Sequence, residues 1–187
     1  MCAGHHNFTR IEKNISISSN RLAGIKTIEG ASVTILNNNI SGNFNQGILL
    51  VESSSAHIEQ NEIYENFKAN IALGGDNSAD TVILRNRIRS SRAEGIFIIE
   101  SGFCQIHANE IINNNDGVVM FDSSPLLLAN DICENARAGV ICGGSSFPRI
   151  ERNLIAHNIA VGILLRDESL TKCLTNKVSY NHPLIIM

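Results

Sequence analysis

Acidic side chains recur at one position of a repeated pattern, where carboxylates could bind a cation or hold a sugar hydroxyl. The position lies five residues after a recurrent glycine, just beyond a short apolar segment. Its occupants are Glu52, Gly75, Glu100, Asp122, Gly144 and Asp167. Only Glu100 and Asp122 are carboxylates in neighbouring repeats, so they are the candidate carbohydrate or cation contact. The alternative is a solvated acidic edge that glycine interrupts, which keeps like charges apart.

Histidine and cysteine offer weaker candidates. His57, His107, His157 and His182 fall at four different places in the repeat, so we expect no metal site, and no cofactor is indicated. The five cysteines are odd in number and form no C-x-x-C pair, which indicates a reducing compartment and a cytoplasmic or nuclear location. Core positions of the repeat hold Cys142 and Cys173. Cys133 is a weak candidate for a catalytic thiol.

Composition limits the class of partner. The 187-residue chain has a net charge of −3 and contains no run of 18 apolar residues. We therefore expect no nucleic-acid partner and no membrane span, and the N-terminal sequence shows no signal peptide. Ile (27 residues) favours strands, and Asn (23 residues) favours tight bends. Many short strands joined by Asn-rich turns are therefore predicted.

A repeat of about 23 residues must position these side chains. The unit reads x-[IVL]-x-x-N-x-[IVL]-x-x-N-x-x-x-G-[IV]-x-[ILV]. We place its first Asn at Asn20, Asn38, Asn61, Asn86, Asn109, Asn130, Asn153 and Asn176. The first spacing, 18 residues, predicts a shortened first coil, and the Asn itself is expected to take the left-handed bend.

Each repeat holds three apolar pieces that are too short for helices. The repeat therefore predicts an all-β, single-stranded right-handed parallel β-helix of about seven coils, with Asn side chains bonded between coils. We expect a partly irregular N-terminal segment at 1–14 and the β-helix at 15–187, one domain or part of a longer protein. A leucine-rich repeat is the rival fold. It is disfavoured because Ile replaces Leu and a Gly-Ile-x-Ile strand replaces its convex segment.

The strand after the glycine has an outward position that is apolar in successive repeats. Its residues are Leu49, Ala72, Phe97, Val119, Ile141 and Leu164. A continuous apolar strip on a sheet usually marks an interaction surface. We therefore expect this strip to bind a protein partner or a second copy, unless another segment or subunit covers it permanently.

Units such as Asn109–Asn114 with Gly117 resemble the parallel β-helix repeats shared by carbohydrate-binding proteins and sugar hydrolases. They are most similar to the β-helix region of eukaryotic F-box-only proteins and SHC-binding relatives. That resemblance implies a non-catalytic interaction module, for which substrate recognition as in F-box-type ubiquitin ligase subunits is one expected role, although this sequence contains no F-box. The alternative is a carbohydrate-binding or polysaccharide-processing protein using Glu100 and Asp122. A structural spacer is the third reading.

Overall fold

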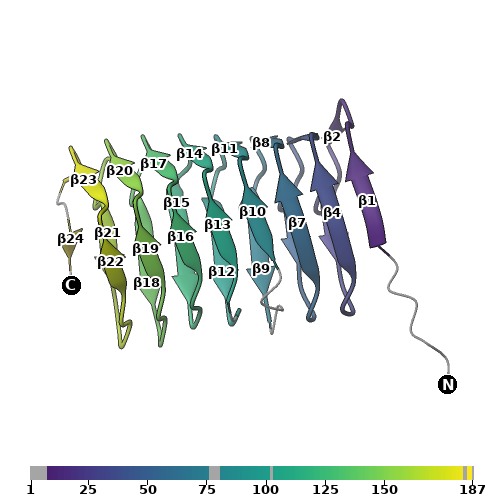
Figure 1. The fold of residues 1–187 in the computed structure, drawn as a ribbon. Coiled ribbons are helices and arrows are strands. Elements are labelled where there is room, and N and C mark those ends of the chain that lie inside the picture. Colours follow the sequence, from purple (N-terminus) through teal and green to yellow (C-terminus); the bar gives the residue numbers. More distant parts are fainter. Residues whose placement is uncertain (1–7, 76–80, 102, 183–184, 187) are drawn as a thin grey trace, which may run out of the picture.

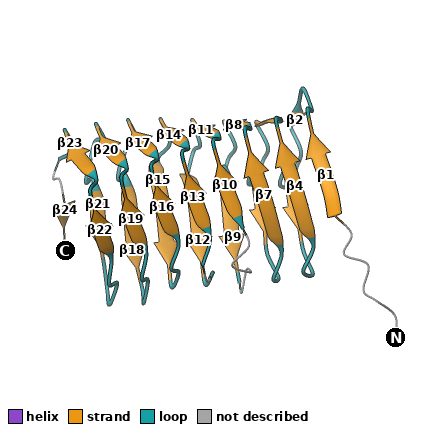
Figure 2. Ribbon diagram, viewed as in Figure 1, coloured by secondary structure: helices purple, strands orange, loops and turns teal. Residues whose placement is uncertain are grey.

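The computed structural model describes residues 8–75, 81–101, 103–182 and 185–186. These residues form strands and turns without a helix (Figure 2). The strands build three parallel sheets of eight strands each within the described residues. One coil contributes one strand to each sheet, and the coils stack along one axis from the N-terminal to the C-terminal end (Figure 1). The prediction of an all-β parallel solenoid is confirmed.

The sheets are named A, B and C in the order in which the chain enters them. Sheet A contains β1 (Phe8–Glu12), β4 (Ser32–Leu36), β7 (Ser55–Glu59), β10 (Val82–Leu84), β13 (Gln105–His107), β16 (Leu126–Leu128), β19 (Arg149–Glu151) and β22 (Lys172–Leu174). Sheet B contains β2 (Ile17–Ser18), β5 (Asn39–Ser41), β8 (Glu62–Tyr64), β11 (Arg87–Arg89), β14 (Glu110–Ile112), β17 (Asp131–Cys133), β20 (Leu154–Ala156) and β23 (Lys177–Ser179). Sheet C contains β3 (Ile25–Thr27), β6 (Ile48–Leu50), β9 (Ile71–Gly74), β12 (Glu94–Ile99), β15 (Asp116–Phe121), β18 (Val140–Gly143), β21 (Ile163–Leu165) and β24 (Ile185–Ile186).

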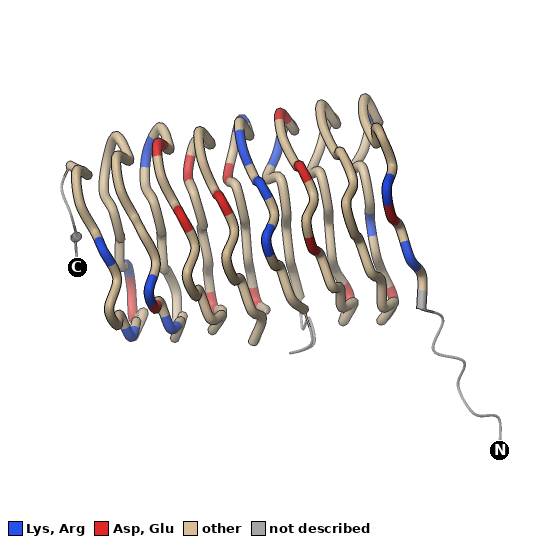
Figure 3. The backbone as a smooth tube through the Cα atoms, turned by 45° about the horizontal axis from the view of Figure 1, so that its top comes forward, with Lys and Arg blue, Asp and Glu red and all other residues tan. Residues whose placement is uncertain are grey.

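The core consists of columns of aliphatic side chains, one residue from each coil. Strand pairing brings identical positions of the repeat into register, and side chains alternate between the two faces of a strand. In sheet B, for example, Ile88 pairs with Ile63 on one side and Ile111 on the other, and all three are fully buried. Charged residues of both signs occur along the coils (Figure 3), and Asp116 is the one of them that is buried among the described residues. The column assignment of the apolar repeat positions is therefore correct from the second coil onward, except that Cys173, which pairs with Ile150 in its column, is exposed and not a core residue.

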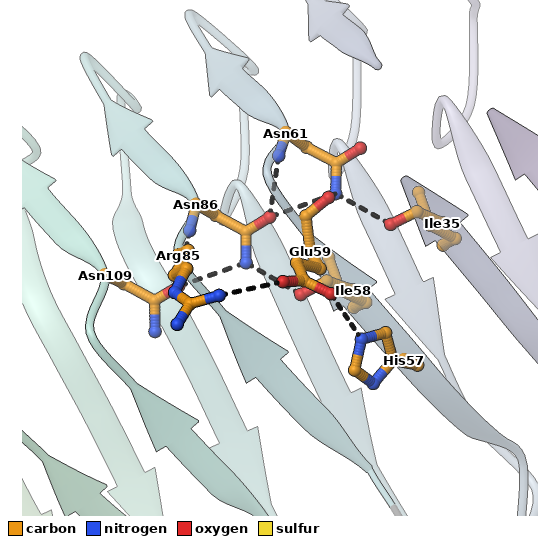
Figure 4. A network of polar contacts seen from close by, with 8 residues as sticks. All are labelled: Ile35, His57, Ile58, Glu59, Asn61, Arg85, Asn86 and Asn109. Atoms are coloured by element: carbon orange, nitrogen blue, oxygen red, sulfur yellow. Dashed lines mark hydrogen bonds and ion pairs between the residues drawn. The ribbon is translucent and has the colours of Figure 1, made fainter. Parts of the chain in front are cut away.

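Two ladders of asparagine side chains hold the bends. The first contains Asn14, Asn38, Asn61, Asn86, Asn109, Asn130, Asn153 and Asn176. In this ladder Asn86 Nδ2 donates to Asn109 Oδ1 at 3.0 Å and to the Ile58 carbonyl at 2.9 Å (Figure 4). The same oxygen of Asn109 also accepts the Asn86 backbone N–H. Each buried amide is thus satisfied within the stack, as buried polar groups must be.

The left-handed bend falls on the residue before the ladder Asn, so the prediction that the Asn itself takes it is wrong. Gln60, Arg85 and Ala108 have φ values of 55°, 51° and 53°. Non-glycine residues pay a cost there, and the structure around them must fix the bend. The ladder does so, because the next residue's amide is bonded to both adjacent coils. The bend position therefore accepts many residue types.

The N-terminal coil corrects three predictions. Asn20 bonds to Asn43 and so starts the second ladder, whereas Asn14 bonds to Asn38 and starts the first. The coil is therefore not shortened, and Leu22 is exposed instead of occupying the Ile40 column. Strand pairing also begins before residue 15, since β1 pairs with β4. Asn20 misled the assignment because it has apolar residues at the distances that either ladder requires.

Candidate binding site on the outer face of sheet C

The predicted apolar strip exists as a column on the outer face of sheet C. Leu49 pairs with Ala72, Ala72 with Phe97, and Phe97 with Val119. The column continues through Ile141 to Leu164. Their chain neighbours, such as Ile96 and Ile98, point into the core. The register of the strip is as the alternation predicts, and its use as a binding surface stays a prediction.

The C-terminal part of the strip is covered by the chain itself. Val119 and Ile141 are only 5% and 6% exposed, because Ala138 and Val161 from the preceding turns pack on them. Phe97, Phe121 and Leu164 pack against the edges of this small outer cluster. The expectation of a solvent-facing strip is wrong here, since the residue before the recurrent glycine reaches over the sheet. We call this the sealed half.

The N-terminal part of the strip, which we call the open half, contains a hollow, although the floor residue Ala72 is itself only 4% exposed. Ala72 is too small to fill the space between Leu49 and Phe97, and the turns beside it carry further alanines. The result is a hollow of about 230 Å³. Its lining residues are Gln46, Lys68, Ala69, Ala72, Ala93, Glu94 and Phe97. The hollow has an alanine floor, one aromatic wall and three polar side chains at its rim, which is the usual make-up of a small-molecule site.

Two acidic residues are paired in adjacent strands here: Glu94 in β12, which lines the hollow, and Asp116 in β15, which does not. Asp116 is nearly buried, and its oxygens accept the Ala138 N–H at 3.0 Å and face Arg137 at 3.5 Å. Both carboxylate oxygens of Asp116 therefore already have partners within the protein. Glu94 is half-buried and has no ion pair among the described residues, so it is the carboxylate a ligand can reach.

Sequence reasoning missed Glu94 and Asp116 because it compared only the columns that repeat. Both occupy the position just before the recurrent glycine. The other residues of that column are Ala23, Gln46, Ala69, Ala138 and Val161. Two acids in successive coils of a mostly small, apolar column were the available signal.

The hollow coincides with the one interruption of the second ladder in the described residues. That ladder contains Asn20, Asn43, Asn66, Asn114, Asn135, Asn158 and Asn181, with Ser91 in the coil between Asn66 and Asn114. Ser91 has no side-chain amide, so it cannot make the amide hydrogen bond to the next coil that each Asn of the ladder makes. Asn70, which stands in the glycine column, takes over: it accepts from Asn66 Nδ2 at 2.8 Å and donates to Asn114 Oδ1 at 3.2 Å.

The two irregular residues require each other. A Cβ atom at Gly47 or Gly139 would lie 2.7 or 2.8 Å from the ladder amide nitrogen of the next coil. A backbone carbonyl oxygen of the next coil would lie equally close, at 2.6 and 2.7 Å. At Asn70 the smaller Ser91 of the next coil removes the contact with the ladder amide. Ser91 in turn connects the turns that line the hollow, since its hydroxyl donates to the Lys68 carbonyl at 2.8 Å and accepts the Ala93 N–H at 3.0 Å. The presence of Ser91 in the ladder position and of Asn70 in the glycine column thereby fixes the rim of the hollow.

Glu100 and Asp122 follow neighbouring strands, as the repeat predicts, and both are exposed in left-handed bends. Asp122 Oδ1 accepts the Ser145 N–H at 2.8 Å, and Asp167 Oδ2 accepts the Gly144 N–H at 3.0 Å. Asp122 and Asp167 thus hold the turn at Gly144 and Ser145, which lies between them, from its two sides. Gly144 has a φ of 62°, and a Cβ there would collide with Asp122. Ligand binding by Glu100 and Asp122 remains untested.

None of the four cysteines that the structure describes has a lowered thiol pKa. Burial raises the pKa of Cys104 and of Cys142 to about 12, and the pKa of Cys133 is also raised, mainly by burial. A catalytic thiol needs the opposite shift. Across the part of the chain that the structure describes, no three His, Cys, Asp or Glu side chains converge on a possible metal position. No helix long and apolar enough to span a membrane occurs there either.

Three parallel sheets, stacked isoleucine columns and continuous side-chain ladders define a parallel β-helix. The chain belongs to the right handed beta helix region family, whose pattern matches residues 8–76 and 69–186. This match also supplies the right-handed sense that the sequence predicts. No curated protein sequence matches the chain.

Two solved structures are similar to it, both from Azotobacter vinelandii. One is the A-module of the mannuronan C-5 epimerase AlgE4, with a TM-score of 0.77 and 17% identity over 93% of this chain and 56% of that one. The other is the AlgE6 A-module, with a TM-score of 0.67 and 18% identity over 90% and 54%. This chain therefore spans just over half of each module, and the similarity establishes the fold. Neither structure is an F-box protein, so that part of the resemblance is without support.

Proposed function

We propose that this β-helix binds a polysaccharide across the outer face of sheet C, with one sugar unit in the hollow over Ala72. The hollow itself carries the proposal. Sugar rings stack their apolar faces on aromatic side chains and hydrogen-bond their hydroxyls to amides and charged groups. Phe97 supplies the aromatic wall, and Gln46, Lys68 and Glu94 supply donors and acceptors at the rim.

The architecture supports a long ligand. Sheet C runs the length of the stack without a helix across its outer face in the described residues, so a polymer could lie along the coils (Figure 1). The two similar solved structures are modules of enzymes named for mannuronan, a polysaccharide. The identity is too low to transfer their activity, but the likeness supports the same class of ligand.

Binding is a better proposal than glycoside cleavage. Hydrolysis of a glycosidic bond usually requires two carboxyl groups on opposite sides of the bond. Beside this hollow Asp116 is bonded to Arg137 and Ala138, which leaves Glu94 as the accessible carboxylate. The proposed role of Glu94 is to accept hydrogen bonds from sugar hydroxyls.

Calorimetry with a panel of oligosaccharides tests the proposal. We expect Phe97→Ala or Glu94→Gln to weaken binding by about tenfold or more, since each removes a central contact. The control is Phe147→Ala, an exposed phenylalanine that does not line the hollow, and it should leave affinity unchanged. Failure of every oligosaccharide to bind, or equal affinity of all four proteins, would overturn the proposal.

A protein partner is the second candidate. Leu49, Phe97 and Leu164 remain half-exposed on the strip, although Val119 and Ile141 do not. A partner could therefore contact Leu49, Phe97 and Leu164 without the covered residues between them. Light scattering and a defined pull-down with Leu49→Asp and Leu164→Asp variants test this candidate. It would gain support if these variants lost association and oligosaccharides did not bind.

A further inference from the structure

An exposed stack of two rings and a guanidinium lies beside the hollow, in the turns between sheets B and C. The Phe44 and Phe67 rings are stacked with centroids 5.4 Å apart and planes 13° apart. Arg92 lies over Phe67 with its guanidinium carbon 4.1 Å from the ring centroid. Phe44 is 57% and Phe67 44% exposed; Phe67 lies between Phe44 and Arg92, so its two faces are covered and its exposed part is the ring edge. We call Phe44, Phe67 and Arg92 the ring stack.

The ring stack and the hollow are continuous. Phe67, Lys68 and Ala69 follow one another in one turn, and Arg92, Ala93 and Glu94 do so in the next coil. Lys68, Ala69, Ala93 and Glu94 line the hollow. A ligand that fills the hollow can therefore extend over the ring stack without leaving the surface.

The charges of the ring stack are not neutralised by the fold. Within the same coil, Arg85 pairs with Glu59 and Arg89 with Glu62. Figure 4 shows the first of these pairs, with His57 also bonded to Glu59. Arg92 and Lys68, in contrast, form no ion pair within the described part of the chain, and the described contact of Arg92 is the Phe67 ring.

We propose that the polysaccharide is acidic, and that its carboxylate or sulfate groups bind Arg92 and Lys68 while a sugar ring stacks on Phe44. This inference rests on the proposed function and names its substrate class. Successive coils lie about 4.8 Å apart, which is on the scale of one sugar unit, so cations on two successive coils can meet charges on successive units. An arginine already held over a ring loses little freedom when it binds an anion.

Three oligosaccharides of equal length test the charge requirement by calorimetry at low and at moderate salt. One carries carboxylates, one carries sulfates and one is neutral. We expect the two acidic ligands to bind more tightly than the neutral one, and their affinity to fall with salt because exposed charges are screened. Preference for one acidic ligand identifies the anion. The inference would be overturned if the neutral ligand bound as well as both acidic ones.

Matched variants locate the contact. Arg92→Gln should weaken acidic ligands by about tenfold or more, since it removes a charge-assisted contact. Arg152→Gln is the control: it makes the same change at an exposed position whose column already contains Gln60, and it should have no effect. All three proteins should keep the same thermal midpoint.

The outcomes separate the two proposals. If oligosaccharides bind and respond to Phe97→Ala, but acidic groups and Arg92→Gln make no difference, the acidic-ligand inference fails and the proposed function stands. If no oligosaccharide binds, both fail. Loss of acidic-ligand binding in Arg92→Gln, with Arg152→Gln unchanged, supports both.

Discussion

The open and the sealed halves of sheet C have the same backbone and different outer surfaces. In both, the strands pair in the same register and the inward residues are buried and apolar: isoleucine and leucine in the open half, and valine, Met120 and Cys142 in the sealed half. The difference lies in the outward residues. The open half has Ala72 beside Ala69, whereas the sealed half has Ile141 beside Val161.

This comparison shows that the fold and the binding surface are specified by different positions of the same repeat. Inward columns and ladders are satisfied within the stack and cannot vary much without loss of stability. Outward positions contact few neighbours and can be exchanged between coils. A hollow can therefore be made in one part of the stack while the coils above and below stay regular.

The largest effect is expected from a change that both halves depend on. Ile111 is fully buried in the sheet B column, so Ile111→Asp places a charge without a partner in the core. We expect a loss of about 4 kcal/mol or more in the free energy of unfolding, measured by urea denaturation. The neighbouring Ile112→Asp, on the outer face, is the control and should cost much less. Equal losses would show that the inward assignment is wrong.

The second effect separates the halves themselves. Ile141→Ala removes buried methyl groups from the outer cluster and should cost about 2–3 kcal/mol of stability. Leu49→Ala shortens a half-buried residue of the open half and should cost about 1 kcal/mol or less. Denaturation of both variants gives the comparison. If the two losses were the same, the sealed cluster would not contribute to stability as its burial indicates.

The sequence predicts what the repeats share and misses what distinguishes single coils. The inward columns and the first ladder can be predicted because the residues that form each of them recur seven or eight times in the sequence at nearly constant spacing. Asn20 was misplaced because, in one coil, two assignments fit equally well. The hollow depends on Ala72, Ser91, Asn70 and Glu94, each of which departs from its column. A search for periodicity treats such departures as noise, and only the structure shows that they lie together.

The third effect concerns Ser91 and Asn70, which fix the rim of the hollow. Ser91→Asn alone should cost about 1–3 kcal/mol, because its amide would enter the space that Asn70 occupies. The double change Ser91→Asn, Asn70→Gly restores the arrangement of the regular coils and should return stability close to that of the parent. A double-mutant cycle in urea measures the coupling between the two sites. Additive losses would mean that the two residues do not depend on each other.

The smallest effect on stability is expected from a change that turns the open half into a sealed one. Ala72→Ile places in the hollow the residue that seals the other half at position 141. The added carbons would lie over the floor formed by Ala69 and Ala93, so we expect a gain of up to about 1 kcal/mol, limited by partial exposure. The same side chain would exclude a sugar unit, so oligosaccharide affinity should fall by about tenfold or more. Leu49→Ile, which keeps the volume of the neighbouring strip residue, is the control and should change neither quantity.

A variant that is stabilised yet binds oligosaccharide as well as the parent would show that the ligand binds outside the hollow. A variant that is destabilised by more than about 1 kcal/mol would show that the space over Ala72 is not free to be filled. Stabilisation together with loss of binding would assign the open half to the ligand, since no residue of the inward columns or the ladders has been changed.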